Sequence, residues 1–195
     1  MITKSNIYGL VLCGGKSSRM GTDKGKLAYH GIPHREYLYN LLNTLCKKTY
    51  LSIRQSQQEE ISGQYPIIVD ADKYKGPFNG ILSAHEYKPQ ATWLVIACDL
   101  PFLNHKTLKY LIDSRNNQKI ATVFATHKTK LPEPLCAIWE PEGLHKAKKL
   151  LEAAQISGPR KFLIDADIQS VFPENDQVLF NANSVNDYKQ ARINL

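Results

Sequence analysis

The sequence predicts an α/β fold, a single doubly wound domain of three layers in which helices cover both faces of a mostly parallel sheet. Apolar runs of strand length alternate with segments of helical periodicity along most of the 195 residues. The run over residues 93–98 is apolar at every position, which is typical of a central parallel strand buried on both faces. In such a domain the ligand site is expected beyond the carboxyl ends of the strands.

The first half of the chain is predicted to form strands over residues 7–12, 50–53 and 66–69. A helix is expected from Pro33 to about Lys47, with apolar side chains spaced to form one face: Tyr37, Leu38, Leu41, Leu42 and Leu45. Lys47 and Lys48 suit the carboxyl end of that helix. Residues up to Gly63 are expected to be partly helical, and a further helix is expected from about residue 75 to residue 87.

The second half continues the alternation. Strands are expected over residues 93–98, 120–125 and 134–139, and helices over 104–115, which Asn104 would cap, and 142–155. A short helix is expected to begin at Gly158-Pro159, and residues 170–172 and 178–180 are expected to be extended. Ser184 is a candidate cap for a terminal helix.

The length of the chain favours one domain, because 195 residues suffice for one sizeable core and are few for two. Its apolar runs are shorter than the roughly 20 residues that span a bilayer, and no secretory signal pattern follows Lys4. We therefore expect a cytoplasmic protein without a membrane segment. The four cysteines contain no Cys-x-x-Cys pair, which favours thiols over a zinc site or a disulfide framework.

The formal charge of +7 favours anionic partners. The lysines and arginines are scattered along the chain, so the charge alone suits a nucleic acid or a small phosphorylated substrate equally. No aromatic stacking motif or helix-turn-helix pattern accompanies the charge, and nucleic-acid binding is therefore given little weight.

The loop that follows the first strand has the composition of a phosphate-binding site. Gly14-Gly15 lets backbone N–H groups approach an anion, and the next residues add the hydroxyls of Ser17 and Ser18. Four cations follow within eleven residues: Lys16, Arg19, Lys24 and Lys26. The spacing fits neither a Walker A loop nor the dinucleotide motif Gly-x-Gly-x-x-Gly. The alternative interpretation is an ordinary strand-to-helix turn with solvated lysines.

Asp70 and Asp99 form a second group of candidates, since each follows an apolar strand. Because parallel strands end at the same edge, both carboxylates are expected beside the glycine loop. One or two carboxylates with phosphate oxygens and water are typical ligands of Mg²⁺. The alternative is that each aspartate caps the next turn, and a metal is favoured more for Asp99, which follows the most apolar strand. Arg160 and Lys161 follow Gly158-Pro159 at an expected helix start, where they would bind an anion or remain solvated.

Four segments together resemble the molybdenum cofactor guanylyltransferases over nearly the whole chain. They are residues 12–25 (Leu-Cys-Gly-Gly-Lys-Ser-Ser-Arg-Met-Gly-Thr-Asp-Lys-Gly), Asp70 with 76–80 (Gly-Pro-Phe-Asn-Gly), 98–102 (Cys-Asp-Leu-Pro-Phe) and 181–183 (Asn-Ala-Asn). The pattern Gly-Gly-x-Ser-x-Arg-Met-Gly is shared with the wider nucleotidyltransferase superfamily, and Asp-Lys-Gly narrows the choice. The resemblance implies a Rossmann-type fold like that of the nucleotide-diphospho-sugar transferases. It also implies a nucleotide-binding half over about 1–115 and an acceptor half over about 116–195.

The resemblance also implies roles for individual residues. The nucleotide would be bound by Leu12, Cys13, Gly14, Gly15, Lys24, Arg54, Asp70 and Asp99, with Mg²⁺ on Asp99. The acceptor would be bound by Arg160, Asn181 and Asn183. Three positions depart from the family pattern. Cys13 replaces a usual alanine, Arg54 replaces an asparagine that helps to bind GTP, and Val185 replaces a common proline.

The activity implied by the resemblance is transfer of GMP from GTP to the terminal phosphate of Mo-molybdopterin, with release of pyrophosphate. Arg19, Lys24 and Asp99 would be the catalytic residues, and Mg²⁺ the cofactor. Proteins that deliver molybdopterin or mature molybdoenzymes would be further partners. The alternatives are another nucleotidyltransferase, which uses CTP on the same pterin or a nucleotide on a sugar phosphate, and a non-catalytic protein that binds the nucleotide or the pterin.

Overall fold

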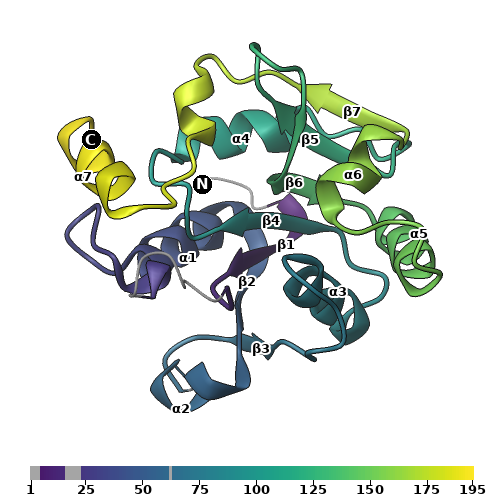
Figure 1. The fold of residues 1–195 in the computed structure, drawn as a ribbon, viewed down its shortest axis with the longest axis horizontal. Coiled ribbons are helices and arrows are strands. Elements are labelled where there is room, and N and C mark those ends of the chain that lie inside the picture. Colours follow the sequence, from purple (N-terminus) through teal and green to yellow (C-terminus); the bar gives the residue numbers. More distant parts are fainter. Residues whose placement is uncertain (1–4, 16–22, 62) are drawn as a thin grey trace.

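The computed structural model describes residues 5–15, 23–61 and 63–195. These residues form a seven-stranded sheet of order β3-β2-β1-β4-β6-β5-β7, flanked by helices on both faces (Figure 1). The strands are β1 (Ser5–Leu12), β2 (Cys46–Ile53), β3 (Ile67–Val69), β4 (Trp93–Ala97), β5 (Ala121–Ala125), β6 (Pro132–Trp139) and β7 (Ile168–Val171). The predicted α/β fold with a mostly parallel sheet is confirmed.

Among the described residues, helices lie between most of the successive strands, but none lies between β5 and β6. The helices are α1 (His34–Leu45), α2 (Gln58–Ile61), α3 (Phe78–Tyr87), α4 (His105–Asp113), α5 (Pro141–Glu152), α6 (Pro159–Ile164) and α7 (Val185–Ile193). Short 3₁₀ helices cover Lys24–Lys26 (η1), Gln55–Gln57 (η2) and Asp176–Leu179 (η3). No helix in the described ranges has the length and apolar character needed to cross a membrane.

Strand β6 runs antiparallel to both of its neighbours, β4 and β5. Only residues 126–131 separate β5 from β6. A connection this short joins antiparallel neighbours, whereas the parallel pairs in the sheet need a longer crossover. The other adjacent strands are parallel to each other.

The sheet separates two hydrophobic cores, one on each face. Helices α1 and α4 pack on one face, and α3, α5 and α6 pack on the other (Figure 1). Strand β4 contributes to both, because Leu94 and Ile96 join the first core while Trp93 and Val95 join the second. This alternation explains why a central strand of the sheet is apolar at every position.

Two predicted elements are wrong in detail. The first helix ends at Leu45, and Lys47 and Lys48 belong to β2 instead of the helix end. Pairing of Cys46 with Ser5 of β1 brings this segment into the sheet, so tertiary pairing overrides the helical pattern. Residues 178–180 were expected to be extended, but η3 covers most of them, with the side chain of Asn175 accepting a hydrogen bond from the N–H of Gln177.

The terminal helix α7 begins where the sequence predicts, with Ser184 as its cap. The Ser184 side chain accepts from the N–H of Asp187, and the Asp187 carboxylate accepts from the N–H of Ser184. Helix α7 packs on the segment after η1 through a small apolar cluster that includes Tyr29 and Ala191. This contact brings residues near 183 beside η1.

Candidate active site

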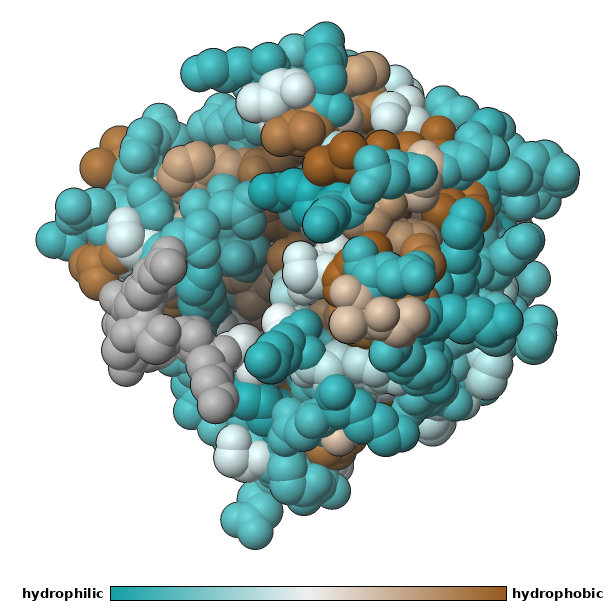
Figure 2. Space-filling view, turned by 45° about the vertical axis from the view of Figure 1, so that its right-hand side comes forward, coloured by the Kyte–Doolittle hydropathy of each residue, from teal (hydrophilic) through white to brown (hydrophobic). Residues whose placement is uncertain are grey.

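A cavity of about 550 Å³ lies at the carboxyl ends of the first four strands. Strand β1 is flanked by β2 on one side and β4 on the other, so successive connections leave it in opposite directions. Such a switch point leaves a crevice where ligands bind in open α/β sheets. Figure 2 shows a mostly hydrophilic surface that is hollowed near the middle of the face in view. We call the cavity the strand-end cavity.

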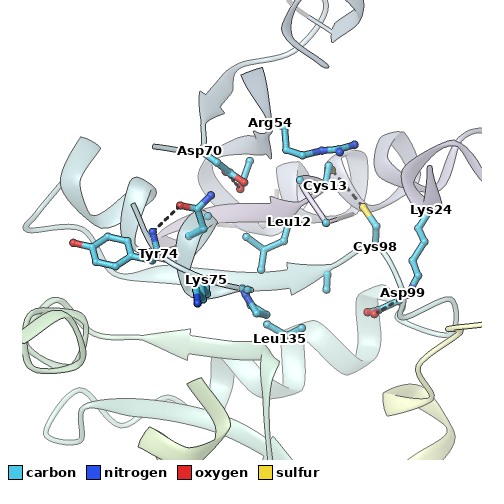
Figure 3. Close-up of a pocket in the computed structure, with 18 of the residues that line it drawn as sticks. Leu12, Cys13, Lys24, Arg54, Asp70, Tyr74, Lys75, Cys98, Asp99 and Leu135 are labelled. Carbon is cyan, nitrogen blue, oxygen red and sulfur yellow. Dashed lines mark hydrogen bonds and ion pairs between the residues drawn. The ribbon is translucent and has the colours of Figure 1, made fainter. Parts of the chain in front are cut away.

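The strand-end cavity brings together the eight residues that the family resemblance assigns to nucleotide binding. They are Leu12, Cys13, Gly14, Gly15, Lys24, Arg54, Asp70 and Asp99 (Figure 3). They lie at the ends of four different strands and in the turn η1, so only the folded sheet makes them neighbours. Arg19, the remaining predicted catalytic residue, lies outside the described residues.

Asp70 forms one wall of the cavity, directly after β3. Its Oδ1 accepts a 2.6 Å hydrogen bond from the hydroxyl of Ser52 in β2. Burial raises the pKa of Asp70 to about 6, against the lowering effects of the Ser52 hydrogen bond and the Arg54 charge. A Cβ on Gly14 would overlap Asp70 Oδ2, so only glycine lets the loop backbone lie this close to the carboxylate. The arrangement suits a ligand that donates hydrogen bonds.

Arg54 follows β2 and lies above Cys13 in Figure 3. Its Nε is buried and has no hydrogen-bond partner among the described residues. A buried donor left unpaired is costly, on the order of 1–3 kcal/mol. An acceptor on a ligand in the cavity would remove that cost, so Arg54 is a candidate ligand contact on a different element from Asp70.

Lys24 and Asp99 face each other on the opposite side of the cavity from Asp70 (Figure 3). Lys24 Nζ lies 3.4 Å from Asp99 Oδ2 and donates a 2.7 Å hydrogen bond to Asn183 Oδ1. Asp99 Oδ1 is buried without a hydrogen-bond partner among the described residues. A carboxylate oxygen without a hydrogen-bond partner is a suitable ligand for a hard divalent cation. Such a cation also binds water and phosphate oxygens.

The turn that carries Lys24 is anchored by side chains that the sequence did not single out. Asp23 caps η1 by accepting a 2.9 Å hydrogen bond from the N–H of Gly25. Gln57 Nε2 donates to Asp23 Oδ2 at 2.9 Å and to the carbonyl of Cys13 at 3.3 Å. Gln57 therefore ties the lysine turn to the end of β1. No local motif marks this role, because the three segments meet only in the folded structure.

Two thiols lie side by side in the wall of the cavity. The Sγ atoms of Cys13 and Cys98 are 3.3 Å apart, and both residues are buried (Figure 3). The hydrogen bond to Cys13, followed by burial, raises the pKa of the Cys98 thiol well above its ordinary value. All four cysteines are thiols outside any disulfide, as the sequence predicts.

The structure brings two of the three predicted acceptor residues together, since Asn183 Nδ2 donates to the carbonyl of Asn181 at 3.4 Å. Asn183 also contacts a residue of the cavity wall, because its Oδ1 accepts the hydrogen bond from Lys24. Asn181 Nδ2 donates to the carbonyl of Leu179. Arg160 binds the protein itself, with its NH2 group donating to Glu133 Oε2 at 2.7 Å and its Nε to the carbonyl of Pro132 at 3.2 Å. Its role in acceptor binding stays a prediction.

The loop between β3 and α3 also lines the cavity, with Asp72, Tyr74 and Lys75. A helix was expected to begin near Lys75, and no role was predicted for its side chain. A cation in the loop that follows a strand end, at the same sheet edge as the glycine loop, is the signal that would have identified it.

Comparison with known proteins identifies relatives of this fold and sequence. A molybdenum cofactor biosynthesis bifunctional protein from Synechocystis sp. is 39% identical over 193 residues, which cover 97% of this chain and 54% of that protein. This chain thus spans about half the length of that relative. A probable molybdenum cofactor guanylyltransferase from Bacillus cereus is 27% identical over 202 residues and 98% of each chain.

A solved structure agrees at the level of the fold. Molybdopterin-guanine dinucleotide biosynthesis protein A from Archaeoglobus fulgidus superposes with a TM-score of 0.78 and 22% identity, covering 96% of this chain and 97% of that chain. The family model of the MobA-like NTP transferase domain matches residues 9–170. This match contains strands β2 to β6, the second half of β1 and the four strand ends that form the cavity. The chain therefore belongs to the family of MobA-like NTP transferase domains.

Proposed function

We propose that this protein transfers GMP from GTP to the terminal phosphate of Mo-molybdopterin, forming molybdopterin guanine dinucleotide and pyrophosphate. The observation that carries the proposal is the strand-end cavity, in which a glycine loop, Lys24 and Asp99 converge at the switch point of the sheet. Relatives with guanylyltransferase names match the chain over nearly its whole length.

The glycine loop and Lys24 would bind the phosphates of the nucleotide. Backbone N–H groups of Gly14 and Gly15 and the Lys24 ammonium would stabilise the charge that develops on the α-phosphoryl group and on the leaving pyrophosphate. The attacking phosphate of the acceptor is already anionic at neutral pH, so no strong general base is needed. Catalysis would then rest on alignment and charge neutralisation.

Asp99 is the residue that would hold a divalent cation, which we propose to be Mg²⁺. The buried Oδ1 of Asp99 fits this role, since it has no hydrogen-bond partner among the described residues. Among those residues no group of three or more His, Cys, Asp and Glu side chains would hold a metal. The bound cation would supply charge neutralisation at the phosphates, whose own oxygens would complete its coordination.

The acceptor would approach from the side of the cavity where the C-terminal segment lies. Asn183 lies next to the cavity, since it accepts a hydrogen bond from the lining residue Lys24. Arg160 would reach an acceptor only after its ion pair with Glu133 opens. Proteins that deliver molybdopterin or accept the finished dinucleotide are the partners that this reaction would need.

The test is GTP-dependent release of pyrophosphate by the full chain, measured with and without molybdopterin in the presence of Mg²⁺. The proposal expects release only when both substrates are present. Equal or faster turnover with CTP or UTP would assign another nucleotidyltransferase reaction. Tight GTP binding without any release would indicate a binding protein.

The contribution of Arg54 to GTP binding is tested separately. Arg54→Ala should raise the KM for GTP roughly tenfold, because one charge-assisted hydrogen bond to the nucleotide would be lost. Arg54→Asn introduces the residue that the resembled family usually carries and should restore part of the affinity. Unchanged KM values for GTP in both variants would remove Arg54 from the nucleotide site.

A further inference from the structure

Cys13 and Cys98 occupy matching positions on two adjacent parallel strands. Leu12 of β1 pairs with Ala97 of β4, and each cysteine follows directly. The N–H of Cys98 donates to the carbonyl of Leu12 at 3.3 Å, which continues the ladder to this point. The pairing places both side chains on the same face, and the Sγ atoms are 3.3 Å apart (Figure 3).

This geometry is close to that of a disulfide. A disulfide has an S–S distance of about 2.05 Å and joins Cα atoms about 4.4–6.8 Å apart. Residues that face each other on neighbouring strands, which lie about 4.8 Å apart, fall within that range. The two sulfur atoms would therefore need to approach by only about 1 Å, which a change in side-chain torsion supplies.

Small solutes reach this pair from the strand-end cavity, because both cysteines line it although little of their surface is exposed. The other two cysteines do not line the cavity. Cys46 begins β2, and Cys136 lies inside β6. Of the four thiols, the pair at the cavity is thus the one placed for reaction with a small oxidant.

We propose that Cys13 and Cys98 form a reversible oxidation site, at which a hydroperoxide converts the two thiols into a disulfide that inactivates the nucleotide site. One thiol attacks the peroxide O–O bond, giving a sulfenic acid and releasing water or an alcohol. The second thiol displaces the sulfenic oxygen as water, and the S–S bond forms. Two thiols are oxidised, and one peroxide is reduced.

The bond would act on the site through its immediate neighbours. Cys13 precedes Gly14, whose backbone faces the phosphates in the proposed function, and Cys98 precedes Asp99. Joining the two sulfur atoms would draw the glycine loop and the Asp99 segment together and shift both from their reactive positions. A displacement of about 1 Å in a catalytic site costs on the order of 10²-fold in rate, and we expect at least a tenfold loss of activity on this scale.

The experiment oxidises the full chain with hydrogen peroxide and follows the bond and the activity separately. Trypsin separates Cys13 from Cys98, so a disulfide appears in mass spectrometry as one linked peptide, lighter by two hydrogens than the two peptides together. GTP-dependent pyrophosphate release should fall at least about tenfold and return after reduction by dithiothreitol. Each protein is compared with its own reduced form.

Two variants sharpen the test. Cys98→Ala removes the pair, so peroxide should leave its remaining activity unchanged relative to the untreated variant. The double variant Cys46→Ala/Cys136→Ala keeps the pair and should lose activity as the natural sequence does. If Cys98→Ala does not fold, the linked peptide and its reversal in the unaltered chain still decide whether the site exists.

Three outcomes would overturn the proposal: no linked peptide after peroxide treatment, a linked peptide with full activity, or the same loss of activity in Cys98→Ala. The activity readout rests on the proposed function, but the peptide readout does not. If the reduced protein releases no pyrophosphate at all, the proposed function fails. The oxidation site is then judged by the linked peptide and by GTP binding measured before and after oxidation.

Discussion

Lys24 and Asn183 are joined by a 2.7 Å hydrogen bond across 159 positions of sequence. The bond holds the Lys24 ammonium 3.4 Å from Asp99 Oδ2, at the wall of the strand-end cavity. A second contact fixes the same segment, since the N–H of Ala182 donates to the carbonyl of Asp99 at 2.8 Å. The C-terminal segment therefore restrains the one lysine that the resemblance assigns to the nucleotide phosphates.

Replacing Asn183 tests whether it acts through Lys24. Asn183→Ala should lower kcat/KM for GTP roughly tenfold, because a hydrogen bond to a charged group contributes about 1.5–3 kcal/mol. In a Lys24→Ala background the same change should cost little, since the interaction is already lost. Steady-state pyrophosphate release by the four proteins of this cycle measures the coupling.

Asn194→Ala is the matched control for Asn183, because the Asn194 side chain is exposed and donates a hydrogen bond to the carbonyl of Gln190 one turn earlier. Its activity should equal that of the unaltered chain. Fully additive effects of Lys24→Ala and Asn183→Ala would show that Asn183 contacts the substrate independently of Lys24.

Asp99 is predicted to be the carboxylate with the largest effect on rate. Asp99→Asn removes the charge that would hold the cation and should reduce pyrophosphate release by roughly 10²-fold or more. Pyrophosphate release is measured over a range of Mg²⁺ concentrations, and excess Mg²⁺ should not restore it. Asp113→Asn is the control, since Asp113 pairs with Lys109 on the exposed surface of α4. An Asp99→Asn variant with intact activity would exclude the metal role.

The two adjacent glycines of the loop should tolerate a methyl group differently. A Cβ at Gly14 would overlap Asp70 Oδ2, whereas a Cβ at Gly15 would meet no described atom within 4 Å. Gly14→Ala should therefore destabilise the fold by about 1–3 kcal/mol and weaken GTP binding. Gly15→Ala should have a smaller effect on both. Urea unfolding and GTP titration of the two variants decide this, and equal losses would contradict the close approach of Gly14 to Asp70.

Asp70 should make the stability of the protein depend on pH. Burial raises the pKa of this carboxyl from 3.8 to about 6, so the folded state binds more protons than the unfolded state between these values. The contribution of Asp70 therefore falls as the pH rises through this window, by on the order of 2–3 kcal/mol, and is constant above it. Below this window the Asp70 carboxyl is protonated in both the folded and the unfolded state, so it adds no pH dependence to the stability there.

The comparison that isolates this effect is urea unfolding of the unaltered chain and of Asp70→Asn at pH values below and above the window. The pH-dependent contributions of the other titratable groups are the same in both proteins and cancel in this difference. One of them is His34, whose pKa is lowered by burial to about 4, so its contribution to stability increases as the pH rises. The advantage of Asp70→Asn should grow as the pH rises. A difference that is independent of pH would show that Asp70 keeps an ordinary pKa in the folded protein.

The sequence was sufficient to predict the fold because its apolar runs are local and regular. Residues 93–98 and the glycine loop mark the central strand and the edge where the site lies, and strand-ending aspartates point to the same edge. The reversed direction of β6 does not follow from alternation alone. Lys47 and Lys48 were misplaced because pairing with β1 decides their structure, and no local pattern records that pairing.

The residues of the site could be predicted only where they belong to a short sequence motif. Gln57 was missed, because its two acceptors, Asp23 and the carbonyl of Cys13, lie on segments far away in sequence. The contact of Cys13 with Cys98 depends on strand register, which composition does not specify. Arg160 has a motif-like position, yet Glu133 is its partner in the structure.

The bond between Lys24 and Asn183 also sets an order of events during protein synthesis. Residue 183 leaves the ribosome long after residues 12–99, which contain all the described residues that line the strand-end cavity except Leu135. A nascent chain can therefore assemble most of the cavity before Lys24 gains its restraint from Asn183. Lys24 is therefore restrained by Asn183 only in chains that have been translated through residue 183.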